Sequence, residues 1–263
     1  MNRQTAPVTR LLRTARLALH ALRGLLTAAL LFPFLAPPTR GKLIRVWSAK
    51  LLAILRIRLT IRGGVPWQGG GGILFAANHI SWLDIFLLNA VHPMRFVAKS
   101  EVRGWPLAGF LAARAGTLFL DRNSRRDAGR ANRDIENALR EGHFVALFPE
   151  GTTTDGRQVR HFHAALLQPA IDADTPLQAV AVRYSGENGE PDTAPAYIDN
   201  LSFGDSLRNI LRRPAIQAEL HFTALLTPHG RNRRELAGTL HNAISGALFP
   251  TPTASHEVKP AGG

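Results

Sequence analysis

The chain has 263 residues, of which 45% are hydrophobic, and is long enough to bury one sizeable core. It contains no cysteine, which excludes disulfides, thiolate metal sites and cysteine catalysis. Its formal charge is +13 and most of its cations are arginines, so it favours an anionic partner: nucleic acid, an acidic membrane surface or a phosphorylated substrate.

The N-terminal segment, residues 1–56, is predicted to associate with a membrane. Residues 10–23 have the pattern of a basic amphipathic helix, residues 24–38 contain no charged residue, and residues 42–56 are a second basic amphipathic segment. Because the uncharged run contains prolines and is shorter than the roughly 20 apolar residues of a straight spanning helix, we expect two helices in the membrane interface. The alternatives are a single transmembrane span and a signal peptide, although the stretch lacks a clean small-x-small cleavage site.

Residues 57–249 alternate between short apolar runs and segments of helical period. Strands are predicted at residues 59–62, 72–77, 117–120, 144–148, 177–184 and 216–226. Helices are predicted near residues 82–90, 106–115, 125–140 (behind an N-cap Ser124), 162–173, 206–211 and 231–247. This order indicates an α/β domain with a mostly parallel or mixed sheet covered by helices on both faces, followed by a flexible tail at 250–263.

The stretch from Asn78 to Asp84 lies where a predicted strand gives way to a predicted helix. Histidine is a suitable general base near neutral pH, and Asp84 could accept the other ring N–H of His79 and fix its tautomer. The alternative interpretation is a turn histidine followed by a helix-capping aspartate. Sites in such sheets gather beyond the carboxyl ends of strands, where His79, Arg122 and Glu150 each follow a predicted strand.

A second motif runs from Phe148 through Glu150, Gly151 and Thr152. Gly151 permits close backbone approach to a ligand, and the threonines add hydroxyl and N–H groups that suit a phosphate or a polyol. Without other motifs, an ordinary polar loop would explain it equally well.

Two cations are candidate phosphate ligands. Arg122 ends a predicted strand and could contact a phosphate through two nitrogens, and Lys99 is the only lysine between Lys50 and Lys259. For both, the alternative is a solvated surface cation.

Other chemistries lack their signatures. His161 and His163 have no third and fourth ligand at suitable spacing, so we expect no metal. Ser81 lacks the Gly-x-Ser-x-Gly elbow, and no Walker or dinucleotide fingerprint is present, so we expect no cofactor. Aromatic residues are only 7% and are not spaced as stacking platforms, which argues against RNA recognition.

Taken in order, these motifs resemble the blocks of the glycerolipid acyltransferases, specifically of the 1-acyl-sn-glycerol-3-phosphate acyltransferase type. The resemblance spans residues 59–184 and rests on Asn78-His79-x4-Asp84, Lys99-Ser100-Glu101 with Trp105-Pro106 and Gly109, Phe119-Leu120-Asp121-Arg122, and Phe148-Pro149-Glu150-Gly151-Thr152.

The resemblance implies transfer of a fatty acyl group from acyl-CoA or acyl-carrier protein to the free hydroxyl of a lysolipid. It places this reaction at the cytoplasmic face of the cell membrane, with no nucleic acid, metal or further cofactor. It also implies roles for the candidate residues: His79 as base, Asp84 as its partner, and Lys99, Arg122, Glu150, Gly151 and Thr152 around the acceptor or its phosphate.

Two positions depart from the usual pattern of these acyltransferases. Ala179 stands where a proline is expected, and Phe162 is followed by His163 and Ala164 rather than by lysine and glycine. These changes look similar to the branch that includes lyso-ornithine-lipid acyltransferases, so both lysophosphatidate and lyso-ornithine lipid stay open as acceptors. A hypothesis of another class is a non-enzymatic basic protein whose binding to membranes or nucleic acid weakens steeply with salt.

Overall fold

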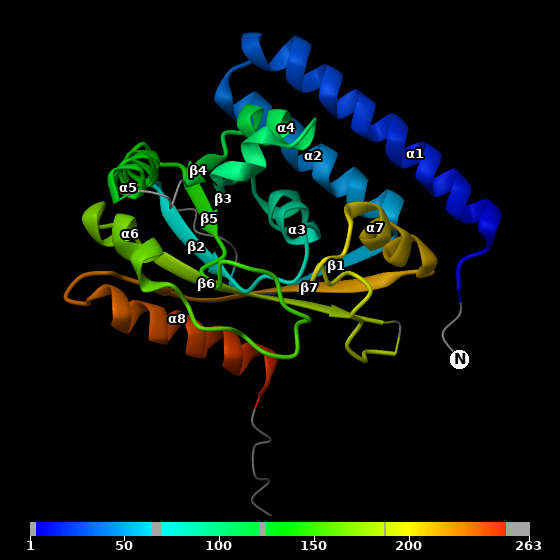
Figure 1. Cartoon of the computed structure of the whole chain (residues 1–263). Helices are drawn as coiled ribbons and strands as arrows, with labels where there is room; N and C mark the ends of the chain where they lie inside the picture. The colour runs from blue at the N-terminus through cyan, green and yellow to red at the C-terminus, as the bar shows by residue number, and fades with distance from the viewer. Residues whose placement is uncertain (1–3, 65–69, 121–124, 187, 251–263) are drawn as a thin grey trace, which may run out of the picture.

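The computed structural model describes residues 4–64, 70–120, 125–186 and 188–250 (Figure 1). The candidate ligand Arg122, the predicted N-cap Ser124 and the predicted tail beyond Pro250 lie outside these residues.

The described residues form one mixed sheet of seven strands in the order β1-β7-β6-β2-β5-β3-β4. Strands β2 to β6 all run in one direction, whereas β1 and β7 pair in parallel with each other and run against β6. The carboxyl ends of β2, β3 and β5, which are neighbours, therefore meet at one edge. The strands are β1 Ile57–Gly63, β2 Ile73–Ala77, β3 Arg95–Lys99, β4 Leu118–Leu120, β5 Phe144–Leu147, β6 Leu177–Ser185 and β7 Ile216–Leu226.

Helices cover both faces of this sheet, as predicted (Figure 1). In β2, Ile73 and Phe75 pack into one hydrophobic cluster and Leu74 packs into the other, because successive side chains of a strand point to opposite faces. The first cluster is closed by α2 Pro37–Leu55, α3 Leu83–Val91 and α7 Phe203–Arg212. The second is closed by α5 Arg125–Arg140, α6 Gln168–Asp172 and α8 Arg233–Leu248.

The N-terminal helix forms a further layer outside α2. Helix α1 spans Pro7–Leu26 and continues through a π-helical turn, Thr27–Leu31, and a 3-10 turn, Phe32–Phe34. Gly24 allows the close approach of the two helices, because a Cβ there would lie 2.5 Å from Trp47 Nε1. This helix is longer than predicted, since the uncharged residues after Arg23 continue it.

Helix α2 corrects the prediction that both N-terminal helices lie in the membrane interface. Its residues Leu51, Leu52 and Leu55 are buried in the hydrophobic core beside the sheet. The amphipathic pattern of residues 42–56 therefore reflects packing on α3 and the strands, which a basic amphipathic sequence alone does not distinguish from lipid contact.

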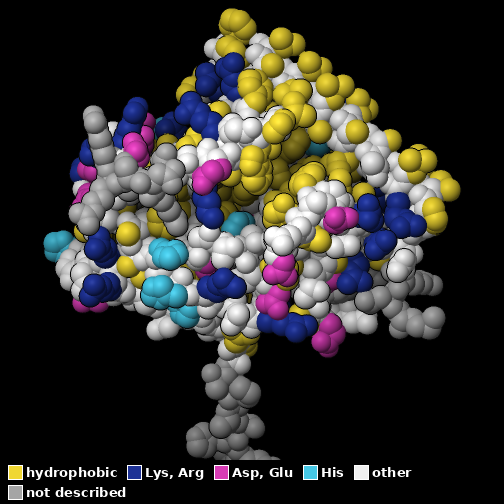
Figure 2. Space-filling model, viewed as in Figure 1, with side chains coloured by type: hydrophobic (Ala, Val, Ile, Leu, Met, Phe, Trp, Pro, Cys, Tyr) yellow, Lys and Arg dark blue, Asp and Glu magenta, His cyan; other side chains and the backbone are white. Residues whose placement is uncertain are grey.

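Helix α1 and its π-helical continuation instead present an apolar stripe to the outside (Figure 2). The stripe comprises Val8, Leu11, Leu12, Leu19, Leu22, Leu26 and Leu30, each between 49% and 70% exposed. By length and composition, Pro7–Phe34 is the one helical segment among the described residues that is long and apolar enough to cross a membrane.

Opposite the stripe, the buried side chain of Arg13 joins α1 to the ends of two other helices. Its guanidinium donates to the carbonyl oxygens of Ile54 and Leu55 at the end of α2, and to those of Leu211 and Arg213 around the end of α7. Carbonyls in the last turn of a helix, such as those of Ile54, Leu55 and Leu211, have no partner within that helix, and a cation is favourable at a helix C-terminus.

The structure differs from the prediction at two elements. No strand was predicted at β3, Arg95–Lys99, which pairs with both β4 and β5. The helix predicted at residues 162–173 is shorter: a 3-10 turn, Ala164–Leu167, leads into the five-residue α6.

Candidate active site

His79 and Asp84 form a hydrogen-bonded pair in the β2–α3 connection. His79 Nδ1 lies 2.8 Å from Asp84 Oδ2, and Asp84 stands in the first turn of α3. The His79 side chain is 19% exposed, whereas that of Asp84 is fully buried. We call these two residues the dyad.

The carboxylate of Asp84 accepts four hydrogen bonds. Its Oδ2 also accepts the backbone N–H groups of Ile80 and Ser81, at 2.8 and 2.9 Å, and its Oδ1 accepts the Tyr184 hydroxyl at 2.6 Å. A carboxylate oxygen can only accept hydrogen bonds, so Nδ1 of His79 carries the hydrogen of the shared bond. The other ring nitrogen, Nε2, is thereby left with its lone pair.

One face of the His79 ring is covered by an aromatic side chain. The ring stacks on Phe148 at a centroid distance of 3.8 Å and an interplanar angle of 10°, and Phe148 in turn stacks on Phe96. Stacking and the hydrogen bond to Asp84 together restrict the imidazole to one orientation.

Glu150 holds the backbone of His79 in place. Its Oε1 accepts the His79 N–H at 2.7 Å, and its Oε2 accepts the Arg160 N–H at 2.9 Å. The side chain is buried, and burial raises the pKa of Glu150 above its ordinary value, an effect opposed by these two backbone hydrogen bonds. In this structure the carboxylate orders the loop that carries the dyad, while its predicted contact with the acceptor stays a prediction.

Asn78 has a structural partner of its own. Its buried amide donates to the Val182 carbonyl at 3.0 Å and accepts the Val182 N–H at 2.7 Å. Since backbone pairing of β2 with β6 reaches only Ala77 and Val180, the Asn78 side chain extends this pairing beyond the strand. Asn78 therefore shapes the turn that follows β2.

The remaining predicted site residues lie at the same edge or outside the described residues. Gly151 has a φ of 72°, a conformation that favours glycine, and Thr152 beside it is exposed. Lys99 is exposed at the carboxyl end of β3, next to β5. Among the described residues, the structure thus joins His79 to Asp84 and to Glu150, whereas neither Lys99 nor Thr152 forms a hydrogen bond with the dyad.

Tyr184 was not predicted as a site residue. It belongs to β6 and lies 100 positions after Asp84, so no local motif links the two. The only signal in the sequence that could have indicated Tyr184 was its position near the carboxyl end of a predicted strand.

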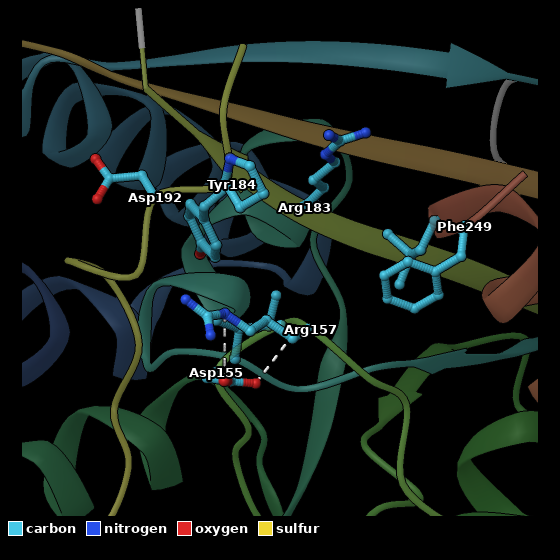
Figure 3. Close-up of a pocket in the computed structure, with 10 residues that line it drawn as sticks. Asp155, Arg157, Arg183, Tyr184, Asp192 and Phe249 are labelled. Carbon is cyan, nitrogen blue, oxygen red and sulfur yellow. Dashed lines mark hydrogen bonds and ion pairs between the residues drawn. The ribbon is translucent and has the colours of Figure 1, made fainter. Parts of the chain in front are cut away.

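A cavity of about 350 Å³ opens beside the dyad loop (Figure 3). Ile80 and Tyr184 contribute to its wall, and Arg157 lies 3.8 Å from Asp155 at its edge. Figure 3 shows Arg157, Arg183 and Phe249 arranged around this space. Its wall therefore shares Tyr184 with the dyad's hydrogen-bond network.

Comparison with known proteins agrees with an acyl-transferring site. The acyltransferase family model matches residues 58–183. A lyso-ornithine lipid O-acyltransferase of Pseudomonas aeruginosa is 38% identical over 214 residues, which cover 81% of each chain. A 1-acyl-sn-glycerol-3-phosphate acyltransferase of Neisseria gonorrhoeae is 42% identical over 163 residues, 62% of this chain and 64% of the relative. The fold and these relatives define an O-acyltransferase with lysolipid-type substrates. The chain belongs to the acyltransferase family.

A solved structure shares the fold. The crystal structure of the 1-acyl-sn-glycerophosphate acyltransferase PlsC from Thermotoga maritima matches with a TM-score of 0.62 and 20% sequence identity, over 90% of this chain and 96% of that one. The predicted α/β architecture with an N-terminal helical segment is thereby confirmed.

Proposed function

We propose that this enzyme transfers a fatty acyl group from acyl-CoA or acyl-carrier protein to the sn-2 hydroxyl of lysophosphatidate, giving phosphatidate. The observation that carries the proposal is the dyad: the hydrogen bond from His79 Nδ1 to the buried Asp84 leaves Nε2 as a base on a partly exposed ring.

The proposed reaction needs two proton transfers, both at Nε2 of His79. Nε2 of His79 takes the proton of the acceptor hydroxyl as its oxygen attacks the thioester carbonyl carbon. Asp84 stabilises the resulting imidazolium. When the tetrahedral intermediate collapses, the carbon–sulfur bond breaks and the imidazolium returns the proton to the leaving thiolate, so no covalent acyl-enzyme is required.

The acceptor's headgroup is proposed to bind at the same edge of the sheet. Lys99 offers a cation at the end of β3, and Gly151 and Thr152 offer backbone N–H and hydroxyl groups beyond β5. Arg122 is proposed as a further phosphate ligand from its place in the sequence.

Lyso-ornithine lipid is the second candidate acceptor. It is favoured by the Pseudomonas aeruginosa relative, whose match extends over more of this chain than that of the Neisseria gonorrhoeae relative. A lyso-ornithine lipid O-acyltransferase of Rhodobacter capsulatus is also 35% identical over 204 residues. Both acceptors present a hydroxyl to the same base, so the mechanism does not depend on the choice.

We further propose that α1 brings the enzyme to the cytoplasmic face of the cell membrane. Its exposed leucine stripe suits acyl chains, and the chain's charge of +13 suits anionic headgroups. A lysolipid acceptor lies in that membrane, so docking through α1 supplies it directly.

The test is acyl transfer from labelled acyl-CoA, and separately from acyl-carrier protein, to each lysolipid in membranes that contain the enzyme. His79→Ala should abolish transfer, whereas His229→Ala, which changes an exposed histidine in the β7–α8 connection, should not. Transfer only to lyso-ornithine lipid would exchange the acceptor and keep the mechanism. Full activity of His79→Ala would refute the base assignment, and no transfer from any donor would favour a non-enzymatic membrane-binding protein.

A further inference from the structure

The phenol of Tyr184 reaches the dyad from another strand of the sheet. It donates to Asp84 Oδ1 at 2.6 Å, and both residues are almost completely buried, with exposed fractions of 3% and 0%. A charge-assisted O–H···O⁻ hydrogen bond at this distance is short and among the stronger kinds in proteins.

The two oxygens of Asp84 are held by different parts of the fold. Oδ2 accepts hydrogen bonds from the loop that carries His79, whereas Oδ1 accepts one from Tyr184 of β6. Rotation of the carboxylate would break bonds on both sides. The phenol thus fixes the orientation of the carboxylate relative to the sheet as well as relative to the loop.

The phenol is in the form that can donate. Burial, followed by the charge of Asp84 and the hydrogen bond to it, raises the pKa of Tyr184 well above its ordinary value. The side chain of Ser81 opposes this rise in the pKa of Tyr184. Besides His79 and Asp84, Glu150 lies nearby, and its carboxylate interacts electrostatically with both. The cavity wall that Tyr184 shares adds the charged side chains of Asp155, Arg157, Arg183 and Asp192.

We propose that Tyr184 is a positioning residue for acyl transfer: its hydrogen bond to Asp84 Oδ1 sets the orientation and charge of the carboxylate that pairs with His79. The inference rests on the proposed function, because it assigns Tyr184 an effect on the base rather than a contact with substrate. It adds a third side chain, drawn from a distant strand, to the dyad.

The first test is Tyr184→Phe, which removes the hydroxyl and keeps the buried ring. We expect kcat to fall roughly 10- to 100-fold, the range for loss of a hydrogen bond to a charged group, with KM for both substrates unchanged. The acidic limb of the kcat/KM pH profile should move to higher pH, because a carboxylate that has lost a donor holds the imidazolium more strongly. Tyr197→Phe, at the chain's only other tyrosine, is the matched control.

A second measurement avoids any loss of packing. In the Tyr197→Phe background, 3-fluorotyrosine incorporated during expression enters only position 184. Its more acidic phenol donates more strongly to Asp84, so the acidic limb should move to lower pH, opposite to the shift in Tyr184→Phe. Equal limbs in the fluorinated and unfluorinated enzymes would overturn the inference.

A double-mutant cycle shows whether Tyr184 acts through Asp84. In the Asp84→Asn background, Tyr184→Phe should cause no further loss of kcat, and an undiminished further loss would overturn the inference. A raised KM with unchanged kcat would also overturn it, because it would show a role in binding. If His79→Ala lost activity while Tyr184→Phe did not, only this inference would fail; if His79→Ala kept full activity, the proposed function would fail first.

Discussion

Replacing Arg13 by Met should destabilise the enzyme although Arg13 is far from the dyad in sequence. The side chain is 4% exposed and donates to four carbonyl oxygens around the ends of α2 and α7. Met keeps most of the side-chain volume and removes all donors. The carbonyls would then be partly buried without a partner at two helix C-termini.

The expected loss is about 3–5 kcal/mol of unfolding free energy, because a hydrogen bond to a charged group contributes about 1.5–3 kcal/mol and several are lost together. In a chain of this length each kcal/mol shifts the unfolding temperature by about 2–4 °C, so the midpoint should fall by about 10 °C.

The assay is thermal unfolding in detergent, monitored by circular dichroism. Arg16→Met is the matched control, because Arg16 lies on the same helix and is exposed, and its midpoint should move by no more than about 2 °C. A midpoint for Arg13→Met equal to that of Arg16→Met would refute the view that this guanidinium holds the ends of two helices.

Three further predictions concern the dyad loop and α1. Glu150→Gln should lower kcat/KM about tenfold or more, since an amide cannot accept both backbone N–H groups, one of them from His79. Because the pKa of Glu150 is raised in the folded state, the wild-type carboxyl favours folding most at low pH. The stability difference, wild type minus Glu150→Gln, should therefore grow as pH falls through the raised pKa toward the ordinary value, as measured by urea unfolding; a difference that shrinks would contradict this. Asn78→Ala should cost about 2–4 kcal/mol, because it leaves both backbone groups of Val182 without their Asn78 partners, and an unchanged urea midpoint would show that water replaces the amide. Leu22→Ser should reduce binding to anionic vesicles about tenfold without lowering the unfolding midpoint, because this leucine is already 51% exposed in the free enzyme; equal vesicle binding would remove the stripe from the docking surface.

Patterns that repeat along the chain predicted most of the sheet. Strand β7 was predicted with its observed bounds, because its buried and partly exposed residues alternate from Ile216 to His221 and beyond. Strand β3 was missed since Arg95 and Lys99 at its ends flank only three apolar residues, too short a run to show a period.

The candidate site could be predicted only where chain order determines proximity. His79 and Glu150 follow neighbouring parallel strands, so the fold rule for carboxyl ends brings them together. Tyr184 and Arg13 could not be found this way. Tyr184 lies 100 positions from Asp84, and Arg13 lies at least 41 positions from the carbonyl groups to which it donates. Only the packed structure shows which buried donor faces which acceptor.

The loop after β5 also sets a limit on how this enzyme can vary in length. This loop hydrogen-bonds to both the N–H and the carbonyl of His79. Glu150 accepts the His79 N–H, and the Thr154 N–H donates to the His79 carbonyl at 2.8 Å. The three residues between Glu150 and Thr154 must therefore span a fixed separation. Insertions or deletions between Glu150 and Thr154 would displace the base, whereas the 186–202 connection has no such pair of contacts with His79 among its described residues. Length variation among functional homologues should accordingly be absent from the first loop and concentrated in the second.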